Sequence, residues 1–225
     1  DVDGFPFILD EVFDEKTKAG VALADYDENG KDDIVLATDD GHIYLIYDNA
    51  SIAPGFPYQA GGKIQTAPSI LDVDGDKVIF SGSLDSNFYA INADGSLRFI
   101  VEANNMIKTS PSFLTHNGND YIFFGANDSL IYAVDTNGDA LSGWPVNADA
   151  PIAKSIVFSD LDCDNEPEVI TSTIQTNIVA YNLDGTTHTG FPIDGSFAFT
   201  SSPVIVDLDN VGDLDILLGA QNELA

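Results

Sequence analysis

Acidic side chains recur at alternate positions in a nine-residue loop that follows the first apolar stretch of the chain. Over residues 25–33 the loop places oxygen side chains at positions 1, 3, 5 and 9 and a glycine at position 6. Calcium takes about six to eight oxygen ligands, and glycine permits the positive φ that a tight curl needs. This loop, loop 1, therefore predicts a calcium site. The predicted ligands are Asp25, Asp27, Asn29, Lys31 at position 7, and Asp33.

Two later loops repeat the pattern: loop 4 (residues 160–168) and loop 5 (residues 207–215). In loop 4, Asn165 stands where loop 1 has glycine, and asparagine tolerates the left-handed conformation. In loop 5, Val211 at position 5 offers only a carbonyl, so we expect a weaker site, or one completed by Asp213 or water. The predicted ligands are Asp160, Asp162, Asp164, Glu166 and Glu168 in loop 4, and Asp207, Asp209, Val211, Asp213 and Asp215 in loop 5.

These loops are not EF-hands, which need a glutamate at position 12 and a helix on each side. Position 12 is Leu36, Thr171 or Leu218, each within an apolar stretch. The acid at position 9 takes the place of that glutamate, directly before the second apolar stretch of the repeat. The pattern indicates sites between two strands.

Two equivalent loops lack the pattern. One keeps three aspartates over residues 72–76 but is shortened, so that Lys77 stands where the closing acid belongs, and the other has only Thr115, Asn117 and Asn119. We expect both to lack an ion. Plain acidic turns are the alternative for all five loops, because Asp and Asn favour turns. Three copies in register favour two to three structural calcium ions.

The loops belong to five repeats of about 45 residues, and such a period indicates a repeat architecture. Each repeat has an apolar stretch, the polar loop, a second apolar stretch, an aromatic stretch and a short last stretch. Short β-branched and aromatic runs between Gly, Asn and Asp turns indicate strands. The predicted fold is all-β, a β-propeller of four-stranded antiparallel blades. A sandwich of hairpins is the alternative, but it does not explain the repeat.

We assign residues 1–225 to one propeller domain of about five blades, either a ring with an incomplete closing blade or a slice of a larger ring. The predicted repeats are 16–61, 62–104, 105–149, 150–196 and 197–225, with 1–15 in the closing blade.

Two aromatic patterns recur within the repeats. Aromatic–proline pairs occur in the last stretch, which suits an edge strand, because proline cannot donate to a central ladder. Tyrosines recur in the third stretch, where we expect them to pack. For Trp144, packing is favoured over stacking on a sugar, because phenylalanine occupies the same place in other repeats. The pairs are Phe5-Pro6, Phe56-Pro57, Trp144-Pro145 and Phe191-Pro192, and the tyrosines are Tyr44, Tyr89, Tyr132 and Tyr181.

The composition limits the partners. With 44% hydrophobic residues the chain can bury a core, and its formal net charge is −29. Such a field repels nucleic acid and anionic membrane surfaces and attracts divalent cations. No apolar run approaches the ~20 residues of a membrane span, and no signal peptide is apparent. The single cysteine, Cys163, excludes an intrachain disulfide.

At its acidic loops the chain resembles the FG-GAP/VCBS-type calcium-binding propeller repeats, which also occur in integrin α subunits. The Asp-x-Asp-x-Asn-Gly-x-x-Asp core over residues 25–33, the Tyr-Ala and Asp-Gly turns and the Gly-Phe-Pro elements carry the resemblance. The Tyr-Ala element is also similar to quinone-cofactor propeller repeats, although no cofactor site is visible. The resemblance implies an extracellular or cell-surface, calcium-stabilised platform within a longer adhesin, hydrolase or lyase.

No catalytic constellation is visible. The histidines His42, His116 and His188 are not spaced as metal ligands, and no Gly-x-Ser-x-Gly is present. We expect a non-enzymatic extracellular binding or adhesion module for a protein or glycan partner. The alternatives are a domain of a secreted calcium-dependent polysaccharide lyase or hydrolase, and a structural spacer. A lyase needs basic groups for its anionic polymer, and the chain has 8 Lys and Arg.

Overall fold

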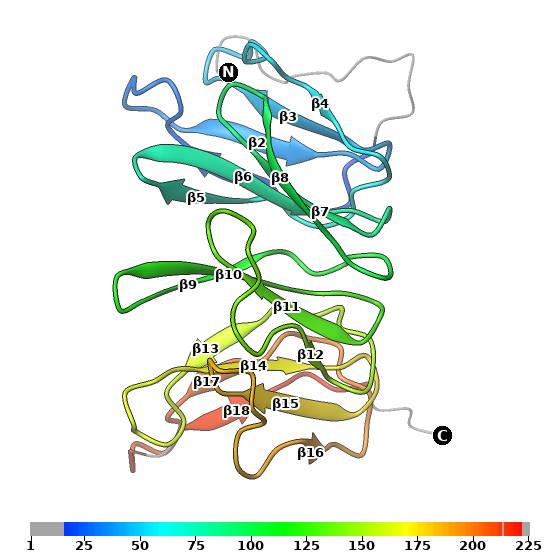
Figure 1. The fold of residues 1–225 in the computed structure, drawn as a ribbon, viewed down its shortest axis with the longest axis vertical. Helices are drawn as coiled ribbons and strands as arrows, with labels where there is room; N and C mark the ends of the chain where they lie inside the picture. The colour runs from blue at the N-terminus through cyan, green and yellow to red at the C-terminus, as the bar shows by residue number, and fades with distance from the viewer. Residues whose placement is uncertain (1–15, 213, 222–225) are drawn as a thin grey trace. The chain divides into compact units, whose positions relative to one another are not determined.

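The computed structural model describes residues 16–212 and 214–221, and in these residues it contains β-strands and no helix (Figure 1). The chain divides into two compact units, residues 1–111 and 112–225, which are described one at a time. Three parts of the sequence-based predictions lie outside the described residues: the Phe5-Pro6 pair, the assignment of 1–15 to a closing blade, and Asp213.

The first unit contains two four-stranded antiparallel sheets, which we call blades 1 and 2. In each sheet the strands lie side by side in chain order, so each blade is an up-and-down meander. Blade 1 consists of β1 (Ala22–Ala24), β2 (Asp33–Ala37), β3 (His42–Ile46) and β4 (Tyr58–Gln59), and blade 2 of β5 (Ser69–Val73), β6 (Asp76–Gly82), β7 (Asn87–Ile91) and β8 (Leu97–Glu102).

The second unit contains two more such sheets and a two-stranded one, blades 3, 4 and 5. Blade 3 consists of β9 (Ser112–His116), β10 (Asn119–Gly125), β11 (Leu130–Val134) and β12 (Val146–Asn147). Blade 4 consists of β13 (Val157–Ser159), β14 (Glu168–Ser172), β15 (Asn177–Tyr181) and β16 (Ile193–Asp194). Blade 5 consists of β17 (Val204–Val206) and β18 (Asp215–Leu217).

The sheets follow the predicted repeats. Every sheet lies within the predicted bounds of one repeat, and β7 and β11 contain Tyr89 and Tyr132 of the predicted aromatic stretches. The fourth strands of blades 1, 3 and 4 are two-residue edge strands that begin directly after Pro57, Pro145 and Pro192, as the aromatic–proline pairs predict. Blade 2 has no such pair, and its fourth strand β8 runs for six residues.

The core of each unit lies between adjacent blades. One cluster joins blades 1 and 2, and in the second unit separate clusters join blade 3 to blade 4 and blade 4 to blade 5. The recurring tyrosines of the third strands are buried, which confirms that they pack; they are Tyr44, Tyr89, Tyr132 and Tyr181.

Trp144 belongs to the core between blades 3 and 4. Its side chain is 7% exposed, and its ring lies edge-on to Phe123 at a centroid distance of 5.3 Å. Its indole N–H donates to the carbonyl of Leu183 at 2.9 Å. The prediction that Trp144 packs is therefore confirmed, and its ring face is not open to a sugar.

Candidate metal centre

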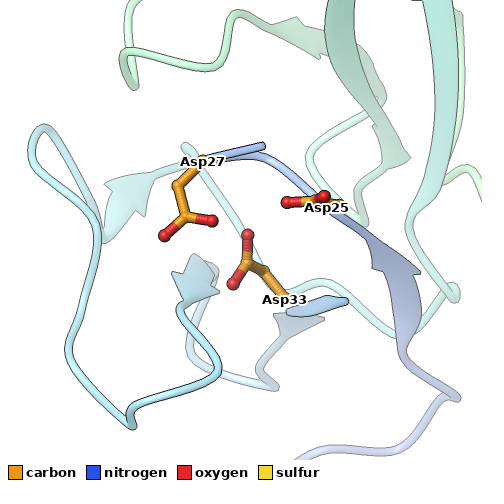
Figure 2. Close-up of side chains that lie close together, drawn as sticks. All are labelled: Asp25, Asp27 and Asp33. Atoms are coloured by element: carbon orange, nitrogen blue, oxygen red, sulfur yellow. The ribbon is translucent and has the colours of Figure 1, made fainter. Parts of the chain in front are cut away.

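Loop 1 brings three carboxylates together between the first two strands of blade 1. Asp25 follows β1 directly, and Asp33 is the first residue of β2. Each of Asp25, Asp27 and Asp33 offers a carboxylate oxygen within 4.8 Å of the other two. Figure 2 shows the three side chains turned toward one another. Asp33 is fully buried, whereas Asp27 is exposed, so the group opens from the core toward solvent.

Backbone N–H groups hold loop 1 in its curl. The N–H groups of Asn29 and Gly30 donate to the two oxygens of Asp25, at 3.0 and 2.8 Å. At the other end, the N–H of Tyr26 donates to Asp33 at 2.8 Å. The carboxylates at positions 1 and 9 are therefore oriented by the loop itself. A carboxylate oxygen can accept more than one interaction, so these bonds leave capacity for a cation.

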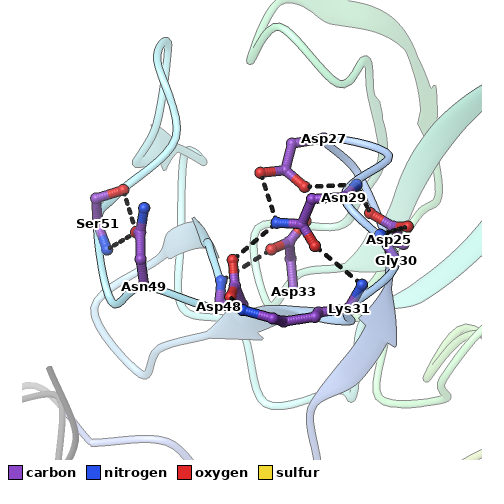
Figure 3. A network of polar contacts seen from close by, with 9 residues as sticks. All are labelled: Asp25, Asp27, Asn29, Gly30, Lys31, Asp33, Asp48, Asn49 and Ser51. Atoms are coloured by element: carbon purple, nitrogen blue, oxygen red, sulfur yellow. Dashed lines mark hydrogen bonds and ion pairs between the residues drawn. The ribbon is translucent and has the colours of Figure 1, made fainter. Parts of the chain in front are cut away.

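Asp48, after β3, closes one side of loop 1 (Figure 3). Its side chain accepts hydrogen bonds from the Asn29 amide at 2.9 Å and from the Lys31 ammonium at 2.6 Å. Its backbone N–H donates to Asp33 at 2.9 Å. The hydrogen bonds from Lys31 and Asn29 lower the pKa of Asp48. Sequence reasoning missed this residue, because it lies in another loop and no spacing rule connects it to loop 1.

The predicted ligands Asn29 and Lys31 use their side chains for other contacts. The Asn29 amide nitrogen also donates to Asp27 at 3.0 Å, and its side-chain oxygen accepts from the N–H of Lys31 at 2.9 Å. The Lys31 ammonium is a donor only, so an ion could meet Lys31 only at its main-chain carbonyl. The structure brings together Asp25, Asp27 and Asp33 and directs the Lys31 side chain to Asp48.

Loop 4 repeats this geometry in blade 4. Asp160, Asp162 and Glu168 offer carboxylate oxygens within 4.8 Å of one another. The N–H groups of Asp164 and Asn165 donate to the two oxygens of Asp160, at 3.1 and 2.9 Å. The N–H of Leu161 donates to Glu168 at 2.6 Å. Donors and acceptors occupy the same positions as in loop 1.

Glu168 is the buried closing acid of loop 4, with 2% of its surface exposed. Burial raises the pKa of Glu168, while the hydrogen bond from Leu161 and the charge of His188, 3.9 Å away, act to lower it. At position 7, the Glu166 carboxylate instead contacts His116 of blade 3 at 2.8 Å. The Glu166 side chain is therefore not part of the carboxylate group.

Loop 5 has the same curl but a more open arrangement. The N–H of Leu208 donates to Asp215 at 3.1 Å, and that of Gly212 donates to Asp207 at 3.0 Å. The other Asp207 oxygen, Oδ1, is buried without a hydrogen-bond partner. Asp215 is exposed, unlike the closing acids of loops 1 and 4. Among the described residues, the carboxylates of loop 5 do not form a group as close as those of loops 1 and 4.

Among their described residues, each of the three loops has two with positive φ. The sequence predicts positive φ at position 6, which is occupied by Gly30, Asn165 or Gly212. The residue at position 4 was missed, because glutamate, cysteine and asparagine occupy it and share no side-chain feature. These residues are Glu28, Cys163 and Asn210, with φ of 58°, 63° and 58°.

Blades 2 and 3 have hairpins in the equivalent place. The β5–β6 ladder continues to the pair Val73 and Asp76, which leaves a two-residue turn at 74–75. The β9–β10 ladder ends at the pair His116 and Asn119, with a turn at 117–118. Both turn residues have positive φ in each hairpin, as two-residue hairpin turns of type I′ require. Such turns have no residues left over to curl around an ion.

The carboxylate groups of loops 1 and 4 fit calcium better than other metals. Their converging donors are all oxygens, and carboxylate and carbonyl sites suit calcium and magnesium rather than transition metals. Calcium is the better match to an irregular set of loop oxygens, because magnesium demands near-ideal octahedral geometry. The unpaired Asp207 oxygen fits the same use in loop 5. Such an ion would cross-link the two strands that flank each loop.

Comparisons with known proteins give the fold class but no family. No family model matches this chain, and no curated protein matches it. Among solved structures, BamB from Moraxella catarrhalis superposes with a TM-score of 0.65 at 16% identity, over 93% of this chain and 60% of BamB. BBS1N, solved in complex with ARL6DN, gives 0.56 at 16% identity, over 93% and 62%.

A computationally designed protein, Ika4, gives a TM-score of 0.52 at 16% identity, over 82% of this chain and 96% of Ika4. The chain thus spans about 60% of the length of the first two solved structures. Together with the antiparallel meanders, the likeness to BamB defines the fold class as a β-propeller. Within the described residues, no helix is long and apolar enough to cross a membrane.

Proposed function

We propose that this protein is a calcium-stabilised, non-enzymatic binding module that presents a propeller surface to a protein or glycan partner outside the cell. The observation that carries the proposal is the repeated loop geometry. Loops 1 and 4 each gather three carboxylates with the same backbone hydrogen bonds, and loop 5 keeps the curl. Ordinary acidic turns have no reason to repeat these bonds at equivalent places.

Calcium acts as a structural ion in this proposal. In each of loops 1 and 4 three carboxylates lie close together, and like charges at such distances repel each other. An ion that binds the folded loop and not the unfolded chain stabilises the folded state by mass action. The ion would then hold together the loop ends of the two flanking strands, β1 with β2 and β13 with β14.

The proposed calcium ions and the negative charge support an extracellular location. Structural sites of modest affinity fill where calcium is at millimolar concentration, as for extracellular modules. The net charge of −29 disfavours nucleic acid, anionic membranes and anionic polysaccharides as partners. The remaining candidate partners are a neutral glycan and a protein surface with basic groups. The chain would bind such a partner as one module of a longer surface or secreted protein. No observation favours the lyase or hydrolase alternative.

The test is binding of the soluble protein to glycan and protein arrays in millimolar calcium and in EDTA, with a parallel search for product release. The proposal predicts calcium-dependent binding without turnover. Release of unsaturated or shortened sugars would instead support the enzyme alternative. If the protein stays folded in EDTA and binds its partner as well as it does in calcium, calcium is not required for binding.

A further inference from the structure

A pocket lies between blades 3 and 4, beside loop 4. Its volume is about 360 Å³, toward the lower end of the ~300–1,000 Å³ of small-ligand pockets. Blade 3 lines it with the β9–β10 hairpin, with β10 and with the loop before β12, and blade 4 lines it with loop 4 and the turn after β15. Both blades belong to the second compact unit. We call it the blade 3–4 pocket, and it has room for a group of side-chain size.

Three large side chains give the pocket an apolar lining. Tyr121, Leu141 and Leu183 pack against the core cluster between blades 3 and 4 and also line the pocket. When the blades are aligned on the last pair of the ladder between their second and third strands, Tyr121 takes the place of Asp33 and Glu168. Blade 3 therefore has an aromatic ring where blades 1 and 4 have the buried closing acid of their acidic loops.

Two carboxylates of blade 4 also line the pocket. Glu166 Oε2 contacts His116 of blade 3 at 2.8 Å, which holds the Glu166 side chain against blade 3. Asp184 Oδ1 accepts from the N–H and from the hydroxyl of Thr186, at 2.9 and 2.6 Å. Within the described residues, no hydrogen bond from another residue uses the second oxygen of either carboxylate. The contacts with Thr186 lower the pKa of Asp184, so this carboxylate is charged at neutral pH.

The lining favours a cationic ligand with several donors. No lysine or arginine is among the residues that line the pocket, and the field of a chain with a formal net charge of −29 attracts cations. A guanidinium group is planar, carries donors only, pairs with carboxylates and stacks on aromatic rings. A cation over the face of a tyrosine is attracted further by the ring. The methylene stem of such a side chain can cover apolar surface, which Leu141 and Leu183 supply. A neutral sugar would leave the negative charge unused.

We propose that the blade 3–4 pocket binds an arginine side chain of a protein partner. The guanidinium pairs with Glu166 and Asp184 and lies on the ring of Tyr121, while the stem contacts the two leucines. The proposal rests on the binding function proposed above and deepens it, because it selects a protein with exposed basic groups over a glycan. Lysine fits less well, since its ammonium is a point charge that neither stacks as a plane nor meets a carboxylate through two parallel hydrogen bonds.

The experiment is an NMR titration of the isotope-labelled full chain in millimolar calcium with three short peptides. The peptides have blocked ends and are identical except for one central residue, which is arginine, lysine or citrulline. The arginine peptide should shift the backbone signals of residues 116–121 and 183–185 until they saturate. Affinity should fall in the order arginine, lysine, citrulline. Citrulline should bind about tenfold more weakly than arginine, because it keeps the shape but has no charge for the carboxylates or the ring.

Two variants test the named contacts. Asp184→Asn keeps an oxygen for Thr186 and loses the charge, so the arginine peptide should bind about threefold to fivefold more weakly. Tyr121→Leu should weaken binding to a similar extent, because it removes the ring. Asp94→Asn is the matched control: Asp94 lies in the equivalent turn after β7, where Ser96 holds its carboxylate as Thr186 holds that of Asp184, and it is outside the pocket. Circular dichroism of each variant checks that it is folded.

Four results would overturn the proposal. They are an arginine peptide that shifts none of these signals, a citrulline peptide that binds as well as the arginine peptide, equal losses in Asp184→Asn and Asp94→Asn, and glucose or N-acetylglucosamine binding at the same residues more tightly than the arginine peptide. None of them removes the proposed binding function, because the melting temperature in calcium and EDTA and the glycan and protein arrays test that function separately.

Discussion

Carboxylates at the first and last positions of loops 1 and 4 have two roles. They accept backbone N–H bonds that set the curl, and they face the point where an ion would bind. Alternate spacing in the sequence predicts Asp25, Asp27 and Asp33 as a group because the curl is local. It cannot find Asp48, which reaches loop 1 only after β3 has paired with β2.

A substitution at Asp162 tests directly whether loop 4 binds calcium. Asp162→Asn keeps the shape of the side chain and removes one of the three charges, so we expect calcium affinity in loop 4 to fall at least tenfold, since affinity depends on the count of charged ligands. Isothermal titration calorimetry measures the change. The control is Asp74→Asn in the hairpin turn of blade 2, which should change nothing; an equal effect of both variants would show a general charge effect.

Asp39 is a second test at the residue scale. Hydrogen bonds from Gln65 and then Lys63 lower the pKa of Asp39 to about 2 from 3.8. Because the folded pKa lies below the unfolded value, the stability that Asp39 contributes is present above about pH 4 and is lost as the pH falls toward 2.

Replacing Gln65 with leucine should raise the pKa of Asp39 toward 3.8, as measured by carboxyl NMR titration. Asp94 serves as the internal control, because contacts with Ser96 lower its pKa. An unchanged pKa of Asp39 in the Gln65→Leu variant would contradict this assignment.

Glycine-containing turns of adjacent blades lie in close contact. In blade 3 the loop before β12 abuts the turn after β15 in blade 4, and a Cβ on Gly143 would lie 1.9 Å from the carbonyl of Asp184. The first unit repeats this contact, where a Cβ on Gly55 would lie 1.9 Å from the carbonyl of Asp94. Aromatic–proline pairs in the sequence locate these loops, but they do not indicate that two glycine turns meet across blades.

Gly143→Ala tests this contact. The substitution meets both a φ of +87° and a backbone atom that cannot move aside, so we expect a loss of more than about 2 kcal/mol in the free energy of unfolding. Gly190→Ala is the control, because φ there is +93° with nothing within 4 Å of the Cβ. It should cost only the left-handed penalty of about 1–2 kcal/mol. Equal losses, measured by denaturant unfolding, would show that the contact contributes little.

The repeat plan made most of the elements predictable. Alternating apolar runs and Gly or Asn turns place every sheet within its repeat, because strand formation within a blade is local. β8 was harder to predict: blade 2 lacks the aromatic–proline pair, and its fourth strand forms a longer ladder with β7. The exposure of Asp215 could not be predicted either, because the sequence does not indicate which neighbouring strands cover a loop.

For the whole molecule, apolar packing and negative charge act in opposite directions. The blades bury apolar clusters between them, while a formal net charge of −29 destabilises the compact state by self-repulsion. Two of the eight Lys and Arg residues, Lys18 and Lys63, contact the single acid Asp39. Divalent cations bound in the acidic loops would offset part of the remaining repulsion, so our proposal predicts a folded state that is more stable in calcium.

The most direct test is thermal unfolding of the wild type in EDTA, in millimolar calcium and in millimolar magnesium, beside the double variant Asp25→Ala with Asp160→Ala. Each filled site should add about 2.7 kcal/mol at a calcium concentration a hundred times its dissociation constant, and each kcal/mol raises Tm by about 2–4 °C in a chain of this size. With loops 1 and 4 both filled to that extent, we predict a calcium-specific rise of about 10–20 °C that the double variant largely loses. A wild type with the same Tm in all three solutions, or a double variant that keeps the full rise, would contradict the account.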